Sequence, residues 1–556
     1  MQAMIFQKVR NREGINLATD VWLPDGPGPW PVVLVRTPYH RQGGTGRGKY
    51  FTDLGYAYVI QDTRGKYDSE GYFRPLEDEA ADGQDTVAWI AEQPWCNGRI
   101  GMTGKSYLGI VQIPAAAGGH EALRCILPGV APNSFFTDWI RYDGCFALAN
   151  LVRWPFDHSI CRTKPTVTHF TWKALWEIGA QGTLAEVEAR AGFASEQLRK
   201  WVALDKYDDY WAAIDQALMY EQVACAGMHQ AGFFDHISRG QFNSFRGIRQ
   251  RGAGEFARNN QRLLVGAWGH GGCEKTTYGE WDFGPTAAID ITAYEQRCLD
   301  LWLKDIDDGI SEEPAVKYFL MGENRWEFAS DWPPPEAEMQ QWYLSSGGEA
   351  RGLGSTGRLS RETPSGAAAD TYIYDPQNPV PTLGGPTYWG MSEWYQPGPV
   401  DQHPLLRRED VLYYRSARLA KPLKVVGDIN LELWITSSAP DTDFIAKLCV
   451  VEPGGRITVL THGSLRCRYR ESWSEPQALQ PGEPTKIHLQ MNNAAYTFPV
   501  GARLGLIVTS SCCPRILPHP NTMAPTWQET DPQQAQQQIL HDSGHESRLL
   551  LPVIDE

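Results

Sequence analysis

The sequence predicts an α/β domain built on a parallel sheet, a helical insertion within that domain, and a C-terminal β-sandwich. Three observations lead to this fold class. Strand-like apolar runs alternate with helical periodicity up to about residue 132. Helical periodicity dominates residues 133–222. Beyond about residue 345, short β-rich runs are separated by Gly, Pro and Asp turns.

The first part of the chain reads as successive strands and helices. Two strands flank a turn at residues 11–14, and continuously apolar or strand-like runs follow as buried strands. The expected strands are PVVLVR (31–36), GYAYVIQDTRG (55–65), GRIGMTG (98–104) and RCILPGVAP (124–132). Helices are expected at LEDEAADGQDTVAWIAEQ (76–93), which has an acidic start, and at YLGIVQIPAAA (107–117). This alternation implies a parallel sheet covered by helices.

The sheet pattern is interrupted and then resumes. Residues 133–222 hold several amphipathic stretches and little that reads as strand, so we interpret them as a helical lid. Strands return with VACAGMHQ (223–230), RLLVGAW (262–268) and AVKYFLMG (315–322), with helices near 240–250 and over 291–307. The α/β domain is therefore predicted to be discontinuous, comprising residues 1–132 and 223–344.

The C-terminal part, residues 345–556, is predicted to be a jelly-roll-like β-sandwich. A Gly/Ser-rich junction, SSGGEARGLGSTG (345–357), precedes it. Short strand-like runs follow, among them VLYYRS, LKVVGDINLELWITSS and ARLGLIVTSSCC, without a convincing long helix. This domain is also a candidate homodimer interface, although no feature of the sequence decides the oligomeric state.

Composition excludes several classes of protein. The 556 residues include 66 acidic and 51 basic side chains, a net charge of −15 that argues against a nucleic-acid partner. No apolar run reaches membrane-spanning length, and the N-terminal MQAMIFQKVRNREG lacks a secretory h-region. The 11 cysteines form no CxxC pair or zinc-ligand cluster, which suggests reduced thiols in a cytoplasmic protein without a metal site.

The sharpest chemical signal is GMTGKSYLGI, in which Ser106 lies between a predicted strand and a predicted helix. A serine on such a turn has a strained backbone and an exposed Oγ, which is typical of a nucleophilic serine. The usual elbow is G-x-S-x-G, but Leu108 stands at the second glycine position and Gly109 follows one residue later. An ordinary tight turn is the alternative interpretation of this motif.

A serine nucleophile needs a base and an acid that orients the base. Asp235 follows the predicted strand VACAGMHQ, and His270 follows RLLVGAW. Both residues are expected at the carboxyl edge of the sheet with Ser106, in the chain order Ser, Asp, His. A helix-capping aspartate and a turn histidine are the alternatives taken singly, but their joint placement favours a catalytic triad.

The chain resembles the family that contains cocaine esterase, the α-amino acid ester hydrolases, the glutaryl cephalosporin acylases and the catalytic part of X-prolyl dipeptidyl peptidases. The resemblance runs nearly end to end. It is carried by RTPYHR (36–41), VIQDTRGKYDSEG (59–71), GMTGKSYLG (101–109), AGFFD (231–235), GAWGH (266–270), YDPQNPVPTLGG (374–385), GPVDQ (398–402) and SSAPDTDFIAKL (437–448). The family elbow is G-x-S-Y-x-G, which accommodates the displaced glycine.

The resemblance implies an α/β-hydrolase core and a role for each candidate residue. Ser106 would be the nucleophile, His270 the general base, and Asp235 the residue that orients the imidazole. The backbone N–H of Tyr107 and the hydroxyl of Tyr39 would form the oxyanion hole. Acyl transfer through an acyl-enzyme needs no metal or organic cofactor. Asp62 and Arg64 are expected to be structural.

The resemblance also implies an aromatic pocket between the lid, the core and the β domain. Its candidate lining residues come from all three parts: Trp139, Tyr142, Trp154, Phe234, Ile237, Tyr388 and Trp389. Such a pocket favours aromatic or alkyl acyl groups in a small-molecule ester or amide. Core packing is the alternative for each of these side chains.

Some relatives are less compatible with the sequence than others. Ile237 and Ser238 stand where α-amino ester hydrolases place carboxylates that bind an ammonium group, and Asp138 would stand alone. Arg141 and Arg153 are candidates for an acylase that binds an anionic side chain. We therefore expect an uncharged ester or amide, with a cephalosporin-type acylase or an aminopeptidase-like amidase as alternatives. A carbohydrate-active protein or a non-catalytic relative are the alternatives from other classes.

Overall fold

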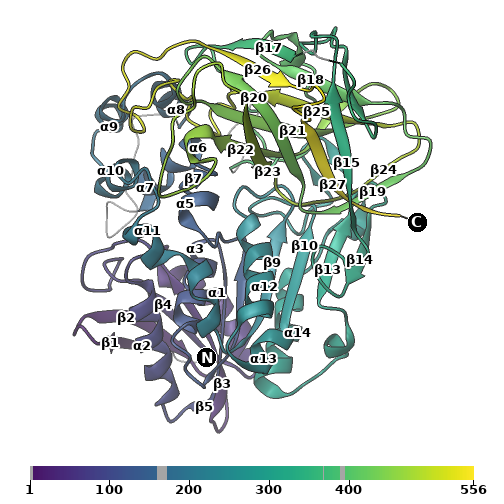
Figure 1. The fold of residues 1–556 in the computed structure, drawn as a ribbon. Coiled ribbons are helices and arrows are strands. Elements are labelled where there is room, and N and C mark those ends of the chain that lie inside the picture. The colour runs from purple at the N-terminus through teal and green to yellow at the C-terminus, as the bar shows by residue number, and fades with distance from the viewer. Residues whose placement is uncertain (1–3, 159–171, 367–368, 389–394, 556) are drawn as a thin grey trace.

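The structure is a computed structural model that describes residues 4–158, 172–366, 369–388 and 395–555. It contains an α/β domain, a group of lid helices and a β-rich domain, coloured in chain order in Figure 1. Among the described helices, none is long and apolar enough to cross a membrane.

The central sheet of the α/β domain is mostly parallel. Its strand order is β1 (Met4–Arg10), β2 (Asn16–Trp22), β4 (Ala57–Asp62), β3 (Trp30–Thr37), β5 (Cys96–Lys105), β6 (Leu123–Gly129), β9 (Ala226–Gly232), β10 (Gln261–Gly266), β13 (Val316–Leu320) and β14 (Arg325–Ala329). Every neighbouring pair from β4 to β13 is parallel, whereas β1, β2 and β14 add antiparallel edges. The predicted parallel sheet is confirmed.

Helices cover both faces of this sheet because its strands are apolar on both sides. Val32 and Leu34 of β3 pack into one core cluster, and the alternate residues Val33 and Val35 pack into another. The helices of this domain are α1 (Thr45–Asp53), α2 (Glu79–Ala91), α3 (Tyr107–Ile110), α4 (Gln112–Ala116), α12 (Arg239–Arg251), α13 (Gly254–Asn259) and α14 (Ile291–Lys304). Residues of α2, α3 and α4 join the first cluster, and residues of α1 and α14 join the second.

The lid is a set of short helices inserted between β6 and β9. They are α5 (Phe135–Asp138), α6 (Leu148–Leu151), α7 (Trp154–His158), α8 (Trp172–Gln181), α9 (Leu184–Ala191), α10 (Glu196–Ala203) and α11 (Asp209–Ile214), with a small hairpin of β7 (Arg141–Tyr142) and β8 (Cys145–Phe146). Local sequence sets several of their starts. The Thr183 hydroxyl accepts from the Glu186 N–H in a capping box, and Asp208 caps α11.

The C-terminal domain is β-rich, as predicted. Its strands are β15 (Glu338–Ser345), β16 (Gly357–Ser360), β17 (Ala369–Tyr374), β18 (Leu412–Ser416), β19 (Leu423–Gly427), β20 (Asn430–Ser437), β21 (Asp443–Val451), β22 (Ile457–Arg466), β23 (Thr485–Gln490), β24 (Ala494–Phe498), β25 (Arg503–Thr509), β26 (Ala535–Leu540) and β27 (Arg548–Ile554). The sequence placed the start of this domain at residue 345, but β15 already pairs with β27. The Gly/Ser-rich junction lies after this first strand, so the boundary is corrected to about residue 338.

The remaining short elements are connections. They are the hairpin β11 (Thr277–Tyr278) and β12 (Trp281–Asp282), and the 3-10 turns η1 (Arg41–Gly44), η2 (Gln216–Leu218), η3 (Tyr220–Gln222), η4 (Pro285–Ala287), η5 (Ile310–Glu312), η6 (Leu405–Arg407) and η7 (Cys467–Tyr469).

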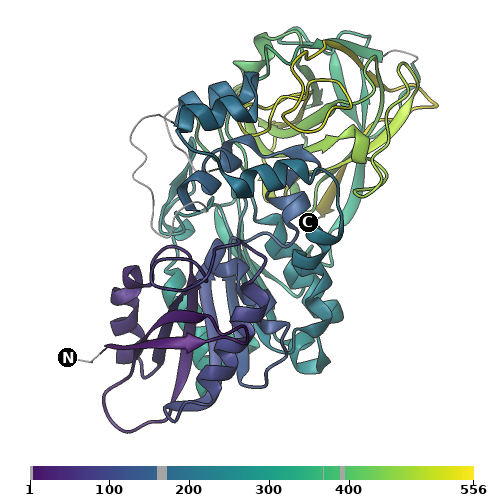
Figure 2. The same ribbon diagram turned by 90° about the vertical axis from the view of Figure 1, so that its left-hand side faces the viewer.

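The lid lies between the α/β domain and the β-rich domain (Figures 1 and 2). Hydrogen bonds fix it to the β-rich domain: the Ala149 N–H donates to the Pro514 carbonyl at 2.9 Å, and the Tyr207 N–H donates to the Trp473 carbonyl at 2.9 Å. Ser106, His236 and His270, which follow β5, β9 and β10, share one cavity with lid residues and with Tyr388 of the β-rich domain, so all three parts border this edge of the sheet, where ligands bind in open α/β sheets.

Candidate active site

Ser106 stands on a sharp turn between β5 and α3. Its backbone has φ 59° and ψ −127°, a strained conformation for a residue with a side chain. The Ser106 N–H donates to the Gly129 carbonyl of the next strand at 2.9 Å, which holds the turn against the sheet. The strand–turn–helix geometry is that of a nucleophile elbow.

Two glycines make this turn sterically possible. A Cβ on Gly104, which has φ +146°, would overlap the Leu108 side chain. A Cβ on Gly109 would lie 2.8 Å from the Gly129 carbonyl oxygen. Leu108, by contrast, packs against the core cluster on the α14 side of the sheet. The close approach to β6 therefore occurs at Gly109, which explains why the second glycine is displaced by one residue.

Asp235 and His270 meet at the ends of β9 and β10. Nδ1 of His270 lies 2.9 Å from Oδ2 of Asp235. The other carboxylate oxygen, Oδ1, accepts from the Ile237 N–H at 2.8 Å. Burial acts to raise the pKa of the Asp235 carboxyl, but His270 and His236 outweigh it and hold that pKa well below its usual range. Asp235 is therefore a buried carboxylate that fixes the orientation of the His270 ring.

A second histidine, His236, shares this carboxylate. Its Nδ1 lies 3.3 Å from Oδ1 of Asp235, and its ring centroid lies 5.0 Å from that of His270. Burial lowers the pKa of His236, although Asp235 acts in the opposite direction. The sequence reasoning did not identify His236, whose only signal was its position next to the predicted acid.

Tyr39 follows β3 and reaches the same edge of the sheet. The indole N–H of Trp154 donates to the Tyr39 hydroxyl at 3.1 Å. Burial is the main reason that the pKa of Tyr39 lies well above its usual range, and the hydrogen bond from Trp154 acts against it. The phenol therefore keeps its proton and lies beside the Ser106 hydroxyl, where it can donate to a developing oxyanion.

Tyr107 is the first residue of α3, so its backbone N–H has no acceptor within the helix. Its side chain points into the core. The Tyr107 hydroxyl donates to Oε1 of Glu79 at 2.8 Å, and Nη1 of Arg36 donates to Oε2 of the same carboxylate at 2.8 Å. The Tyr107 ring stacks on Trp154 with centroids 5.6 Å apart. The buried Arg36–Glu79 ion pair holds the Tyr107 hydroxyl and therefore helps to fix the turn at Ser106.

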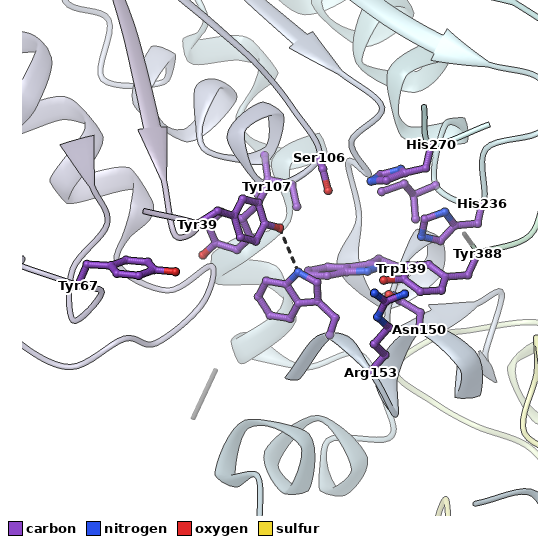
Figure 3. Close-up of a pocket in the computed structure, with 13 residues that line it drawn as sticks. Tyr39, Tyr67, Ser106, Tyr107, Trp139, Asn150, Arg153, His236, His270 and Tyr388 are labelled. Atoms are coloured by element: carbon purple, nitrogen blue, oxygen red, sulfur yellow. Dashed lines mark hydrogen bonds between the residues drawn. The ribbon is translucent and has the colours of Figure 1, made fainter. Parts of the chain in front are cut away.

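Tyr39, Ser106, Tyr107 and the two histidines border a cavity of ≈ 410 Å³. In Figure 3, Ser106 lies between Tyr39 on one side and His270 with His236 on the other. The cavity is lined by Tyr39, Tyr67, Ser106, Tyr107, Ile110, Trp139, Asn150, Arg153, Trp154, His236, Ile237, His270 and Tyr388. The α/β domain, the lid and the segment before β18 all contribute to this wall.

Comparison with known proteins places the chain in a family. Residues 13–272 match the X-Pro dipeptidyl-peptidase (S15 family) model, and residues 308–550 match the model of the X-Pro dipeptidyl-peptidase C-terminal non-catalytic domain. Cocaine esterase of Rhodococcus sp. is 32% identical, with 98% of this chain and 97% of that protein covered. The chain belongs to the S15 peptidase and cocaine esterase family.

Solved structures of related enzymes share the whole architecture. An aminopeptidase from a marine sediment Thaumarchaeota archaeon superposes with a TM-score of 0.87 at 25% identity, covering 100% of this chain and 97% of that one. An α-amino acid ester hydrolase gives a TM-score of 0.85 at 26% identity, covering 99% and 96%. The S15 and cocaine esterase family consists of α/β-hydrolases, and the chain is a serine hydrolase that acts on ester or amide bonds.

The S15 family fold brings some predicted pocket residues together and separates others. Trp139, Trp154, Ile237 and Tyr388 line the cavity, and Trp389 lies outside the described residues. Phe234 does not line the cavity, because its ring stacks on Tyr278 in the core with centroids 5.9 Å apart.

Tyr142 is also not among the residues that line the cavity of Ser106. The Arg515 guanidinium lies 4.1 Å from the centroid of the Tyr142 ring, and both residues border a separate small cavity of ≈ 10 Å³. Tyr142 and Phe234 are therefore corrected from pocket residues to packing residues.

The charged candidates of the lid differ in their access to the site. Asp138 is buried and paired with Arg239, whose Nη2 lies 2.6 Å from Oδ1 of Asp138. Arg141 is fully buried, and its guanidinium lies over the rings of Phe136 and Phe146. Arg153 lines the Ser106 cavity, with its guanidinium 5.9 Å from the centroid of the Tyr388 ring. Only Arg153 of these three borders the cavity.

Asp62 and Arg64, expected to be structural, make buried ion pairs. Oδ2 of Asp62 lies 2.7 Å from Nη1 of Arg41, and Oδ1 of Asp82 lies 2.7 Å from Nη2 of Arg64. Within the described ranges, one group of acidic and histidine side chains is close enough to share a cation: Asp235, His236 and His270. The Asp235–His270 contact that supports a triad belongs to the same group.

Proposed function

We propose that the protein is a serine hydrolase of uncharged esters or amides that uses a Ser106–His270–Asp235 triad. The observation that carries the proposal is the strained elbow at Ser106 beside a histidine that Asp235 orients at 2.9 Å. On its own, a serine hydroxyl is a weak nucleophile, and a neighbouring imidazole base activates it.

The reaction follows from the positions of these groups. His270 takes the Ser106 proton as Oγ attacks the substrate carbonyl, and the Asp235 carboxylate stabilises the imidazolium that forms. The Tyr107 N–H and the Tyr39 hydroxyl donate to the oxyanion of the tetrahedral intermediate. The imidazolium then gives its proton to the leaving alcohol or amine as the acyl-enzyme forms. Water, deprotonated by His270, attacks the acyl group and releases the acid.

The charge of the cavity supports an uncharged substrate over one with a free amine. None of the described residues that line the cavity is a carboxylate. Asp138, the lid carboxylate that the sequence offered for an ammonium group, is paired with Arg239 instead. A cationic substrate would therefore lose its hydration without gaining a counter-ion.

Labelling with a fluorophosphonate, followed by intact-protein and peptide mass spectrometry, tests the proposal. We expect one stoichiometric adduct on Ser106, and none in the Ser106→Ala variant. The variant should lose hydrolysis of p-nitrophenyl butyrate while keeping its thermal unfolding temperature. An adduct on another serine, or full turnover by Ser106→Ala, would refute the triad.

A further inference from the structure

Tyr67 lines the cavity that contains Ser106, and the proposed mechanism assigns it no role. It is half-buried and lies in the loop that follows β4. Its hydroxyl makes no hydrogen bond with the residues that the structure describes. The hydroxyls of Tyr58 and Tyr413 also lack a partner in the described ranges, but they are enclosed by protein, whereas that of Tyr67 is not. A molecule in the cavity can therefore reach the Tyr67 hydroxyl.

Tyr67 and its neighbour His40 have backbone conformations that side chains disfavour. φ is 48° at Tyr67 and 84° at His40, and both values lie in the left-handed region that L residues rarely adopt. The two rings stack with centroids 4.2 Å apart and an interplanar angle of 18°. Strain of this kind persists where the surroundings enforce it, and it concentrates at ligand-binding sites.

Arg41 enforces both strained positions, because it follows His40 in the chain and binds the residues around Tyr67. The Arg41 N–H donates to Oδ1 of Asp62, and Nη1 donates to Oδ2 of the same carboxylate, both at 2.7 Å. Nη1 also donates to Oδ2 of Asp68, the residue after Tyr67, at 2.7 Å. The Tyr67 ring is therefore held in place before a substrate enters, so that a contact with it costs little conformational entropy.

Tyr67 keeps its proton at neutral pH. Burial is the main cause that raises its pKa, and the neighbouring Asp62 carboxylate acts in the same direction. The hydroxyl is therefore a hydrogen-bond donor. A substrate that covers this hydroxyl and displaces water from it must supply an acceptor, or the donor is left unpaired.

The position of Tyr67 indicates which part of the substrate it meets. In Figure 3, Tyr39 and Tyr67 lie on one side of Ser106, and the Tyr67 hydroxyl points back toward the cavity. His270 and His236 lie on the other side. Because His270 gives its proton to the leaving group, the leaving group lies on the histidine side. The acyl chain is then directed away from the histidines, toward Tyr67.

We propose that Tyr67 determines acyl specificity by donating a hydrogen bond from its hydroxyl to an oxygen on the far part of the substrate acyl chain. The preferred substrates are then esters or amides whose acyl chain carries a carbonyl oxygen several bonds from the scissile bond. A site that offers a hydrogen-bond donor to its substrate discriminates against an analogue that lacks the acceptor. The inference rests on the proposed function and names the substrate class of the same site.

Matched p-nitrophenyl esters test the inference, with kcat/KM corrected for spontaneous hydrolysis. The shortest pair is the 4-oxopentanoate and the 4-methylpentanoate, in which a carbonyl oxygen replaces a methyl group. Pairs with one, two and three further methylene groups cover the distance from Ser106 to the Tyr67 hydroxyl. A second series carries the same substituents on the alcohol of an acetate ester, which places them on the leaving group.

The wild type should prefer the keto ester in the acyl series at one or more chain lengths. Tyr67→Phe, which keeps the ring and its stacking on His40, should lower the keto-to-methyl ratio of kcat/KM by about 5- to 20-fold, the value of one hydrogen bond. His40→Gly, which accepts the same φ but removes the stacked ring, should lower the ratio by a smaller factor. Tyr343→Phe is the matched control, because it removes a hydroxyl that donates to Gln341 in the β-rich domain, and it should leave the ratio unchanged.

Three results would overturn the inference and leave the proposed function intact. The first is the absence of a keto preference at every chain length of the acyl series, while Ser106 still reacts with the fluorophosphonate. The second is a keto-to-methyl ratio that Tyr67→Phe leaves unchanged, even if both rates fall, since a merely structural role would lower both alike. The third is a Tyr67-dependent preference confined to the alcohol series, which would place Tyr67 beside the leaving group. Failure of fluorophosphonate labelling together with loss of all ester hydrolysis would instead overturn the proposed function, and this inference with it.

Discussion

The indole N–H of Trp154 donates to the Tyr39 hydroxyl at 3.1 Å, which links the lid to the candidate oxyanion hole. An indole nitrogen can only donate, so the phenol oxygen is the acceptor in this pair. The Tyr39 proton is therefore not directed at Trp154, and Ser106 borders the same cavity as Tyr39. The lid thus orients the hydroxyl that we propose as an oxyanion-hole donor, and it also lines the cavity.

Tyr39→Phe should lower kcat by about 10²- to 10³-fold with little change in KM, since it removes one oxyanion-hole donor. Trp154→Phe should lower kcat less, because it leaves the Tyr39 hydroxyl in place and removes only the group that orients it. Steady-state kinetics with p-nitrophenyl butyrate measure both effects. Full kcat in Tyr39→Phe would exclude the hydroxyl from the oxyanion hole.

The two histidines beside Asp235 should differ sharply when each is replaced by alanine. His270 is the closer to the carboxylate, at 2.9 Å against 3.3 Å for His236. His270→Ala should reduce kcat by about 10⁴- to 10⁶-fold, as expected for the base of a triad. His236→Ala should lower kcat only about 10-fold, because it removes a group that positions the Asp235 carboxylate. Stopped-flow acylation rates compare the two variants.

The opposite order of effects would assign the base to His236. A chelator provides an independent check on the same cluster. Dialysis against EDTA should leave kcat of the wild type unchanged if these side chains form a triad. Loss of activity that Zn²⁺ restores would assign the cluster to a metal ion instead.

The sequence located the ends of the strands well, and with them the candidates for catalysis. Ser106, Asp235 and His270 each follow a parallel strand, and strand ends meet at one edge of a sheet whatever the details of packing. The direction of a side chain within a turn is a finer property. The Asp235 N–H donates to the Gly232 carbonyl in a tight turn, so its neighbours diverge: Phe234 enters the core and His236 faces the cavity.

Residues that depend on tertiary packing were less predictable. Asn150 carries no local signal, because an asparagine in a short helix of the lid resembles any surface residue until the β-rich domain covers it. The start of the β-rich domain was predicted too late in the chain for a similar reason. β15 lies before the Gly/Ser-rich junction in sequence but pairs with β27, the last strand of the chain. Long-range strand pairing of this kind leaves no trace in local composition.

Gly109→Ala should destabilise the fold by about 1–3 kcal/mol, because the new Cβ would lie 2.8 Å from the Gly129 carbonyl oxygen. Gly46→Ala in α1 is the matched control, since a Cβ there meets no atom within 4 Å. Alanine should stabilise that helix by up to about 1 kcal/mol. Urea unfolding followed by circular dichroism compares the two variants with the wild type. A Gly109→Ala variant as stable as the wild type would show that the turn at Ser106 can move away from β6.

His229 should make the fold sensitive to acid. It is fully buried on β9, and its Nε2 lies 3.0 Å from Oε1 of Gln261. The Gln261 amide nitrogen donates to the Cys225 and Ala257 carbonyls, so Oε1 accepts and His229 is the donor. Burial lowers the pKa of His229 to about 4, although its hydrogen bonds act to raise it. The ring is therefore neutral in the folded state at neutral pH.

The sign of the effect follows from proton linkage. In the unfolded chain the imidazole is protonated below about pH 6.5, whereas the folded protein resists protonation down to about pH 4. Between these values the unfolded state binds more protons, so the free energy of unfolding falls as the pH falls. At about 1.4 kcal/mol for each pKa unit, His229 contributes a loss of about 3 kcal/mol across this window.

His229→Gln, which keeps a donor for Gln261, should abolish that part of the loss. His488→Gln, a change at an exposed side chain, should leave the pH dependence as it is in the wild type. Urea unfolding of the three proteins between pH 4 and 7 measures the slopes, and parallel slopes for His229→Gln and the wild type would refute the assignment.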